Sequence, residues 1–296
     1  MRWKRGRGGN QIEDRRGQGF GGGFGGLGRL GRGGGFGLPI PMGGGISGIV
    51  LIAVVLVVLF MSGVLGGGSG PGPGGGERVA GAPNADAELV EFMGFVVDDV
   101  QDSWRQDFAS SGRTYQSTKL VLFDGQTQSG CGPASSETGP FYCPADRKVY
   151  LDLGFFRELS QRFDAPGDFA QAYVIAHEFG HHVQTLLGTE GRMRQEQQRR
   201  PSEANELSVR LELQADCYAG VWAHSAYQEN LLETGDVEEG LTAAASVGDD
   251  RIQRSAGQRV DPERWTHGSS AQRTQWFQTG YRSGDPGACD TFSGSI

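Results

Sequence analysis

Three histidines and one glutamate stand close together in AHEFGHHVQ, residues 176–184, although the whole chain has only five histidines. Residues four apart share one face of a helix, with Cβ atoms about 5–6 Å apart, and His177 and His181 have this spacing. His182 is rotated by about 100° from His181 and points elsewhere. The spacing predicts His177 and His181 as two nitrogen ligands of a metal, with Glu178 beside a metal-bound water, in the pattern H-E-x-x-H.

The residues around these histidines are mainly apolar, which indicates a buried helix rather than a surface helix with two chance histidines. They include Tyr173, Val174, Ile175, Phe179, Val183 and Leu186. Gly180 costs about 1 kcal/mol in a helix interior relative to alanine, and we interpret it as keeping the space above the metal open. His182 is expected to pack or to support the ligands.

Two carboxylates with the same spacing follow in RLELQADCYAG, residues 210–220. Glu212 and Asp216 lie among apolar residues, where unpaired carboxylates are costly. A catalytic zinc takes three protein ligands and keeps one position open. We therefore predict Glu212 as the third ligand of a single Zn²⁺, and Asp216 as the acceptor of a ring N–H from His177 or His181. The alternative is an amphipathic helix with solvated acids.

The segments HEFGHHVQ and ELQADCYAGVW resemble those of a bacterial family of neutral zinc metallopeptidases, which are single-pass membrane proteins. The resemblance runs from about residue 77 to 292 and includes CGPASSETGPFYCPADRKVYLDL, GDDRIQ, THGSSAQR and GACDTF. It implies an α+β, mainly helical zincin fold with a small β-sheet, and peptidase activity. The order H-E-x-x-H and then E-x-x-x-D, met by Glu212 and Asp216, is similar to that of the gluzincins.

A weaker resemblance concerns the C-terminal third of the chain. Membrane-associated gluzincins of the CAAX-protease and heat-shock types carry T-H-P, with an arginine six residues after the histidine. Here His267 and Arg273 keep that offset, but Gly268 replaces the proline. The resemblance implies that His267 stabilises the oxyanion and Arg273 holds the substrate backbone; the alternative is a loop histidine without a role. By fold analogy, the strand KVYLDL with Tyr150 would pair with an extended peptide.

Composition divides the chain into unlike parts. Residues 1–76 hold 29 of the 51 glycines, with eight Lys/Arg and two Asp/Glu, whereas the remainder holds 19 and 33. Residues 1–45 are expected to be a disordered Arg/Gly-rich tail and residues 66–76 a flexible linker. Residues 77–296 form the predicted metallopeptidase domain. The acidic charge of this domain disfavours nucleic acid as its partner, and a nucleic-acid-binding role of the tail is the less favoured interpretation.

Residues 46–65 are twenty consecutive uncharged residues, the length that crosses a hydrocarbon core of about 30 Å. The run is longer, and farther from the first residue, than the apolar part of a signal peptide. The Lys and Arg residues that precede it predict a cytoplasmic N-terminus and an extracytoplasmic catalytic domain. The sequence therefore predicts a single-pass protein of the cell membrane.

The four cysteines are expected to form disulfides outside the cytosol. Three pairings are possible, and the sequence alone does not fix one of them. We favour Cys131–Cys143, which closes a short Gly/Pro-rich loop, together with Cys217–Cys289. A cysteine metal site is disfavoured because no CxxC pair is present.

Hydrophobic periodicity and capping signals predict an order of helices and strands. The predicted elements are a helix 87–108, strands 119–123 and 148–153, and helices 155–163, 169–187, 202–231, 237–256 and 270–280. Asp168 and Gly188 are the expected cap and stop of the H-E-x-x-H helix. The polar segment 188–202 is expected to be a loop or a frayed helix.

These patterns favour a membrane-anchored zinc endopeptidase that acts outside the cytosol on a peptide or protein substrate. Zn²⁺ would lower the pKa of its water, and Glu178 would take the proton from that water. The alternative is a non-catalytic zinc-containing domain that binds a cell-envelope partner, and the presence of Glu178 favours the enzyme. Substrate, regulation and oligomeric state are not indicated by the sequence.

Overall fold

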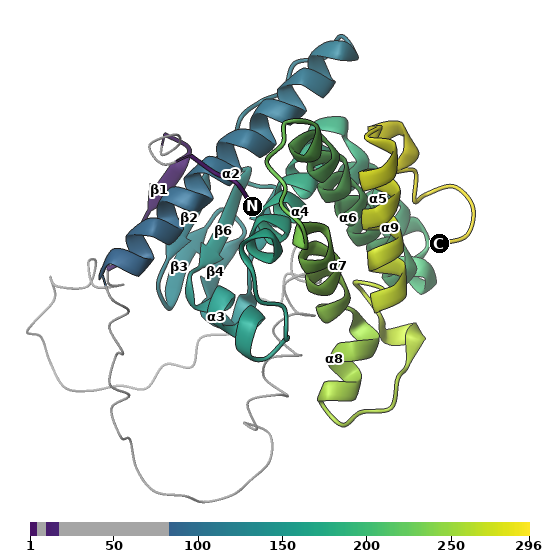
Figure 1. The fold of residues 1–296 in the computed structure, drawn as a ribbon. Helices are drawn as coiled ribbons and strands as arrows, with labels where there is room; N and C mark the ends of the chain where they lie inside the picture. Colours follow the sequence, from purple (N-terminus) through teal and green to yellow (C-terminus); the bar gives the residue numbers. More distant parts are fainter. Residues whose placement is uncertain (5–9, 18–82) are drawn as a thin grey trace, which may run out of the picture.

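The computed structural model describes residues 1–4, 10–17 and 83–296, and places a small sheet beside a larger group of helices (Figure 1). This mixed, mainly helical architecture agrees with the predicted fold class. No helix within the described ranges combines the length and apolar content needed to cross a bilayer. The predicted membrane span 46–65 and the linker 66–76 lie outside those ranges.

The helices and strands follow one another along the chain in the order given next. They are β1 (Ile12–Asp14), α2 (Pro83–Ser110), β2 (Leu120–Phe123), β3 (Gln126–Ser129), β4 (Gly132–Ser135), β5 (Phe141–Cys143), β6 (Lys148–Asp152), α3 (Gly154–Gln161), α4 (Asp168–Leu187), α5 (Thr189–Arg199), α6 (Ala204–Gln228), α7 (Asp236–Ser246), α8 (Asp249–Ser255) and α9 (Ser270–Ser283). Short 3-10 turns include Ser136–Thr138, Pro201–Glu203, Pro262–Arg264 and Pro286–Ala288.

The main sheet has the strand order β1-β2-β6-β5. Strands β1, β2 and β6 are parallel, and β5 runs antiparallel to β6. Leu120 and Leu122 of β2 join the main hydrophobic core, whereas Val121 and Phe123 join a smaller cluster on the opposite face. Both faces are therefore buried, which explains why β2 is continuously apolar rather than alternating.

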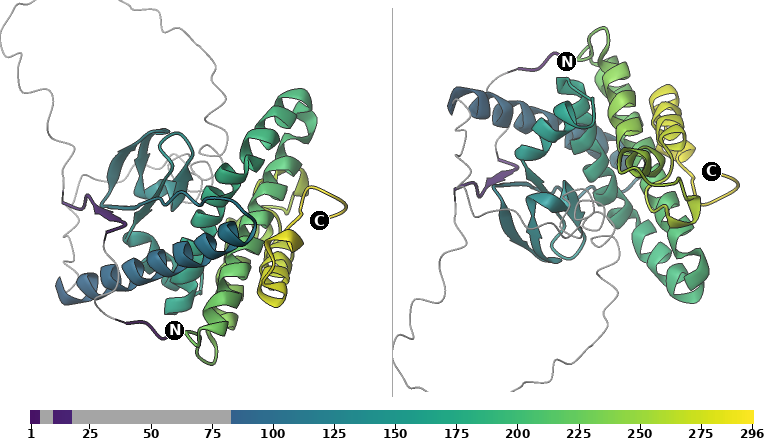
Figure 2. Two further views of the ribbon diagram at one scale, coloured as in Figure 1. Left: turned by 90° about the horizontal axis from the view of Figure 1, so that it is seen from above. Right: turned by 90° about the horizontal axis from the view of Figure 1, so that it is seen from below.

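Helix α2 packs its predicted apolar stripe into the main core, and α4 runs through the middle of that core. Helices α6 and α9 cross at close range, since a Cβ atom on Gly280 would collide with the carbonyl oxygen of Cys217. Figure 2 shows from two sides that α9 lies far from the sheet and that the other helices separate the two. This arrangement fixes α4 and α6 side by side at the centre of the molecule.

Two predicted segments differ from the structure. Residues 189–199 form the helix α5, stabilised by the ion pair of Arg194 with Glu190 one turn earlier and by burial of Met193. The single helix predicted over 237–256 is broken into α7 and α8 around Gly248, where a Cβ atom would collide with Ser270. The break brings the first residues of α8 against the loop that precedes α9.

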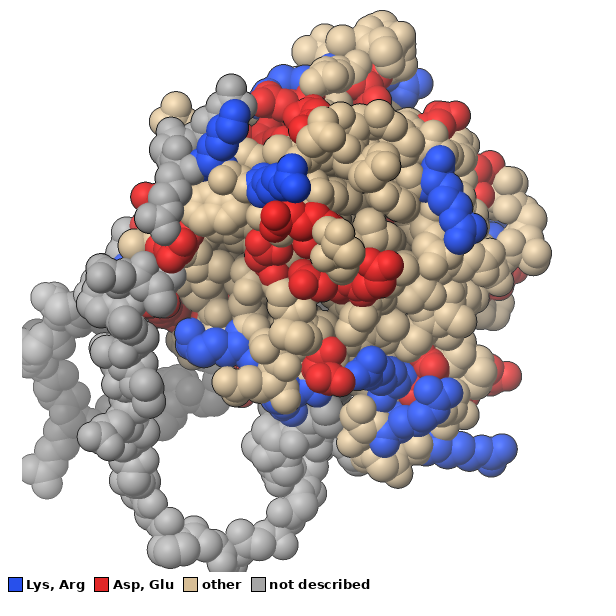
Figure 3. All heavy atoms as spheres, viewed as in Figure 1, with Lys and Arg blue, Asp and Glu red and all other residues tan. Residues whose placement is uncertain are grey.

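The prediction of a disordered tail over 1–45 is wrong for Ile12–Asp14, which pair with β2. The physical reason is a set of specific polar contacts, described below, that composition does not reveal. The amino group of Met1 contacts Asp168 and Asp236, at 2.9 and 3.2 Å. The prediction of Asp168 as a helix cap is also corrected, because Asp168 is the first residue of α4 and Gly167 is in the cap position. Figure 3 shows acidic side chains gathered on the face of the molecule where Figure 1 marks the N-terminus.

Both favoured disulfides, Cys131–Cys143 and Cys217–Cys289, are present. The first ties the β3–β4 hairpin to β5, and the second ties α6 to the C-terminal segment. Their sequence separations are 12 and 72 residues. The second bridge therefore removes more entropy from the unfolded chain than the first.

We expect the double variant Cys217→Ser/Cys289→Ser to lose about 4 kcal/mol of unfolding free energy, against about 3 kcal/mol for Cys131→Ser/Cys143→Ser. The larger loss follows from the longer loop. Chemical denaturation of both variants and the parent chain, followed by circular dichroism, measures the difference. Equal losses in the two variants would contradict this order.

Candidate metal centre

Helices α4 and α6 bring the three predicted ligands together. The Nε2 atom of His177 lies 3.2 Å from Glu212 Oε2, and that of His181 lies 3.5 Å from Glu212 Oε1. The ligand atoms of the three residues all lie within 4.8 Å of one another. Two ligands about 2.05 Å from a tetrahedral zinc are roughly 3.3 Å apart. The donor types and their spacing therefore fit a zinc ion with one position left for water or substrate.

Asp216 lies behind His177. It projects from the same face of α6 as Glu212, because the two residues are four apart. Its carboxylate is fully buried and lies 2.9 Å from His177 Nδ1. The hydroxyl of Tyr173 donates to the same carboxylate. A proton held on Nδ1 leaves Nε2 free to ligate, so Asp216 fixes the tautomer and orientation of the ligand.

Arg273 of α9 lines the same cleft as the histidines and contacts Asp216. Its side chain is 4% exposed, and Nε and Nη2 donate to Asp216 at 2.8 and 2.9 Å. Nη1 donates to the carbonyl oxygen of Val247. Burial raises the pKa of Asp216, but the Arg273 guanidinium and His177 lower it below its ordinary value, so Asp216 stays ionised. A contact of Arg273 with substrate backbone stays a prediction.

The electrostatics of the site favour a bound cation. Burial raises the pKa of Glu212, but the His181 charge and the bonds from both histidines lower it further, well below its ordinary value. Burial lowers the pKa of His177, but the Asp216 and Glu212 carboxylates raise it to about 10. Without a metal, Arg273 and protons on His177 and His181 compensate the buried carboxylates Glu212 and Asp216. A divalent cation bound at the two Nε2 atoms would take the place of those protons.

His181 has a supporting side chain that the sequence interpretation missed. Its Nδ1 lies 2.8 Å from Oε1 of the buried Gln184. Gln184 Nε2 donates to the Leu211 carbonyl and to Oε1 of Gln214, and Gln214 Nε2 donates to the Cys289 carbonyl. These contacts orient both amides. The available signal was the spacing, because a residue three positions after a helical histidine lies beside it.

His267 reaches the cleft from the loop before α9. Its Nδ1 lies 3.3 Å from Asp249 Oδ1, and Asp249 Oδ2 accepts the backbone N–H groups of residues 266–268. Burial lowers the pKa of His267, but Asp249 and the charge of Glu212 raise it above its ordinary value. Gly268 has φ of +89°, which proline cannot adopt. This conformation accounts for the departure from T-H-P.

A cleft of about 1280 Å³ runs between β5 and the segment 247–267, and His177, Glu178 and His181 lie along it. Strand β5 has no strand partner on its outer edge within the described residues. The predicted peptide-binding strand 148–153 is instead β6, which is paired on both sides. Its Tyr150 is 1% exposed and donates to Asp146, so the prediction that Tyr150 contacts substrate is wrong.

Gly180 also has another role than the predicted one. A Cβ atom at this position would lie 3.1 Å from the Ala215 carbonyl oxygen and 3.2 Å from the Ala215 Cα. The glycine therefore permits the close approach of α4 to α6 rather than leaving space above the metal. His182 faces away from the ligands and bonds Tyr142 and the Gln116 carbonyl.

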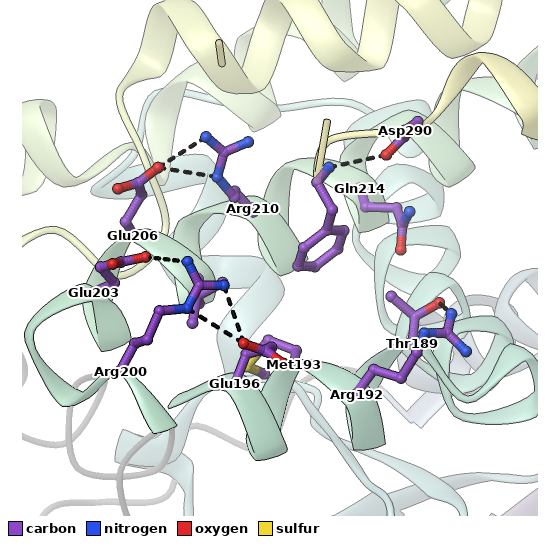
Figure 4. Close-up of a pocket in the computed structure, with 12 residues that line it drawn as sticks. Thr189, Arg192, Met193, Glu196, Arg200, Glu203, Glu206, Arg210, Gln214 and Asp290 are labelled. Atoms are coloured by element: carbon purple, nitrogen blue, oxygen red, sulfur yellow. Dashed lines mark hydrogen bonds and ion pairs between the residues drawn. The ribbon is translucent and has the colours of Figure 1, made fainter. Parts of the chain in front are cut away.

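A second hollow, of about 440 Å³, lies at α5 and α6 (Figure 4). Five of its charged residues form ion pairs with one another: Arg200 with Glu196 and Glu203, and Arg210 with Glu206. None of the histidines lines it. The first cleft, which holds the His177 cluster, is therefore the candidate active site.

The chain has a mainly helical α+β fold, two histidines on one helix with a glutamate between them, and a further glutamate on another helix. This combination is typical of zinc metallopeptidases. The chain belongs to the family described as "Putative neutral zinc metallopeptidase", which matches residues 1–292. It is 47% identical to the uncharacterized protein YpfJ of Escherichia coli (strain K12) over 301 residues, covering 100% of both chains.

A second relative is the uncharacterized protein Rv2575 of Mycobacterium tuberculosis (strain ATCC 25618 / H37Rv). It is 52% identical over 190 residues, which cover 60% of this chain and 64% of the relative. No solved structure is significantly similar to this chain. The family thus suggests zinc and peptidase chemistry, and the relatives' names add no substrate.

We expect Gln184→Met to weaken zinc binding about 10–100-fold, because His181 loses the acceptor that orients its ring. Methionine keeps most of the side-chain volume. Competition with a chromophoric chelator at fixed pH measures the affinity. Gln278→Met on α9 is the matched control and should bind zinc as the parent chain does; an equal affinity in both variants would contradict the role of Gln184.

Proposed function

We propose that this chain is a zinc-dependent endopeptidase. The observation that carries the proposal is the placement of Glu178, buried in the cleft on the same helix as His177 and His181. His177, His181 and Glu212 would hold the zinc, which would supply a Lewis acid for the scissile carbonyl and for a water molecule.

Glu178 is suited to accept the proton of the attacking water. Burial raises the pKa of its carboxyl group above the ordinary value, although the charges of His177 and His181 oppose this. A raised pKa brings a carboxylate closer to the neutral range, where a general base can take a proton and return it. The same carboxyl group would then pass the proton to the leaving amine.

His267 is suited to stabilise the negative charge that develops on the carbonyl oxygen. It lines the same cleft as Glu178, and Asp249 favours its protonated form. A donor already held in place stabilises an oxyanion without reorganisation during the reaction.

The outer edge of β5 is suited to an extended peptide, which would add to the sheet as a further antiparallel or parallel strand. Apolar side chains of the cleft would receive substrate side chains, and they include Phe141, Phe155, Phe163, Ile252 and Val260. Binding along an edge requires an extended stretch of substrate on both sides of the cleaved bond. This requirement favours an endopeptidase.

Both disulfides support a proposal that the enzyme works outside the cytosol, because such bonds persist in oxidising compartments. Attachment to a membrane through residues 46–65 stays a prediction from their length and lack of charge. The second candidate function is a non-catalytic zinc domain that binds a cell-envelope partner. Glu178 favours the enzyme, since binding alone needs no general base.

We expect the full chain to bind one zinc and to cleave an unfolded protein such as casein. Glu178→Gln should keep the zinc and lose at least about 100-fold in cleavage rate, because the general base is absent. Glu212→Ala should lose the zinc as well. Metal analysis of the purified variants and release of casein fragments measure both quantities.

Glu158→Gln is the matched control, since Glu158 lines the same cleft but stands on α3 and should leave both quantities unchanged. Zinc binding without cleavage by the parent chain would favour the binding domain. Cleavage by Glu178→Gln at the parent rate would overturn the proposed mechanism.

A further inference from the structure

Residues 10–17 are joined to the body of the molecule by backbone hydrogen bonds. Ile12–Asp14 pair in parallel with residues 120–122. Leu120 N donates to the Gln11 carbonyl at 2.9 Å, and Arg15 N donates to the Leu122 carbonyl at 2.8 Å. Figure 2 shows β1 at the outer edge of the sheet, on the side away from α9.

Side chains of the same segment reach two other strands, β3 and β6. The carboxylate of Glu13 accepts from Lys148 of β6 at 2.7 Å and pairs with Arg15 at 2.6 Å. Arg15 Nη1 donates to the Gln128 carbonyl of β3 at 2.8 Å. Its guanidinium carbon lies 5.7 Å from the ring centre of Tyr150. The pairing of β1 is therefore specified by side chains as well as by backbone.

Two earlier residues also contact the body. Arg2 N donates to the Leu231 carbonyl at 2.7 Å. The ring of Trp3 packs edge-on against Phe92 of α2, with centroids 5.7 Å apart. Contacts at β2, α2 and the turn after α6 thus hold the N-terminal part of the chain against the body at separate places.

Without β1, the outer edge of β2 would present unpaired backbone N–H and C=O groups. Residues 120–123 of this strand are almost completely buried, between 0 and 1% exposed. An open apolar edge of this kind is an aggregation hazard that proteins usually cover. Residues 10–17 provide that cover from within the same chain.

The position of this segment conflicts with a single membrane crossing. Residues 46–65 lie between β1 and α2 in the sequence, and one crossing would separate the two ends by a hydrocarbon core of about 30 Å. Hydrogen bonds require contact within about 3 Å. Pairing of β1 with β2 and one crossing by residues 46–65 therefore exclude each other in the same molecule.

The charge bias that predicts a cytoplasmic N-terminus has another explanation. Among the eight basic residues before residue 46, Arg2 pairs with Glu233, Arg15 with Glu13, and Arg16 with Asp14. Three of the eight basic residues therefore form ion pairs within the folded chain. The number of basic residues before residue 46 is then a weaker guide to membrane orientation than the positive-inside rule assumes.

We propose that the folded protein keeps residues 10–17 and 83–296 in the same compartment, with β1 as a built-in edge strand that completes the sheet. A single crossing between these two parts is then excluded. The proposal is independent of the peptidase chemistry, because none of the contacts of β1 involves a residue of the metal centre.

Labelling with a membrane-impermeant maleimide tests the compartment. The four native cysteines are all in disulfides, so Asn10→Cys and Ala109→Cys each place a single exposed thiol in the full chain. Each variant is labelled in sealed cells and again after the membrane is opened. Equal behaviour of the two thiols supports the proposal, whereas one labelled and one protected thiol would overturn it.

Zero-length cross-linking with a carbodiimide tests the pairing itself. The Glu13 carboxylate and the Lys148 amine, 2.7 Å apart, should form an amide bond that mass spectrometry of the digested full chain detects. Lys148→Arg keeps the positive charge but has no reactive amine, and it should abolish the cross-linked peptide; so should Glu13→Gln. Absence of the peptide from the parent chain would overturn the docking of β1.

Discussion

The close approach of α4 and α6 is the constraint on which the rest of the structure depends. A Cβ atom at Gly180 would lie only 3.1 Å from the Ala215 carbonyl oxygen, and this close contact helps to set the distance at which His177 and His181 meet Glu212. A larger residue at position 180 would move the carboxylate away from both imidazoles. The sheet, α2 and α9 pack around this helix pair and hold it in the core.

The burial of charge at this crossing explains several features at once. Asp216 is fully buried and is compensated by Arg273, Tyr173 and His177 together. Such a network is costly unless every member has a partner. It ties α9 to α4 and α6 through side chains rather than through backbone contacts alone. The break in the helix at Gly248 and the loop held by Asp249 carry His267 to the cleft.

Features set by helical spacing were predicted from the sequence, and features set by contacts between distant elements were not. The offsets of four residues place His177 beside His181 and Glu212 beside Asp216 in any helix. The role of Arg273 depends on where α9 crosses α6, and the exposed edge of β5 depends on the strand order, neither of which has a local signal. Ile12–Asp14 were hidden by the glycine-rich composition around them. The partners of the cysteines were a choice among three, and the choice that favoured a short loop was confirmed.

The bridge between Cys217 and Cys289 gives the metal centre a link to the redox state of its surroundings. Cys217 follows Asp216 directly, and the Cys289 carbonyl anchors Gln214, which holds the amide that supports His181. Coupling between two equilibria is reciprocal. If the intact bridge strengthens zinc binding by some free energy, bound zinc stabilises the bridge against reduction by the same free energy. The reduction potential then falls by about 30 mV for each 1.4 kcal/mol. The difference in the reduction potential of this disulfide between the zinc-bound and the zinc-free chain would therefore measure the coupling between the bridge and the metal site.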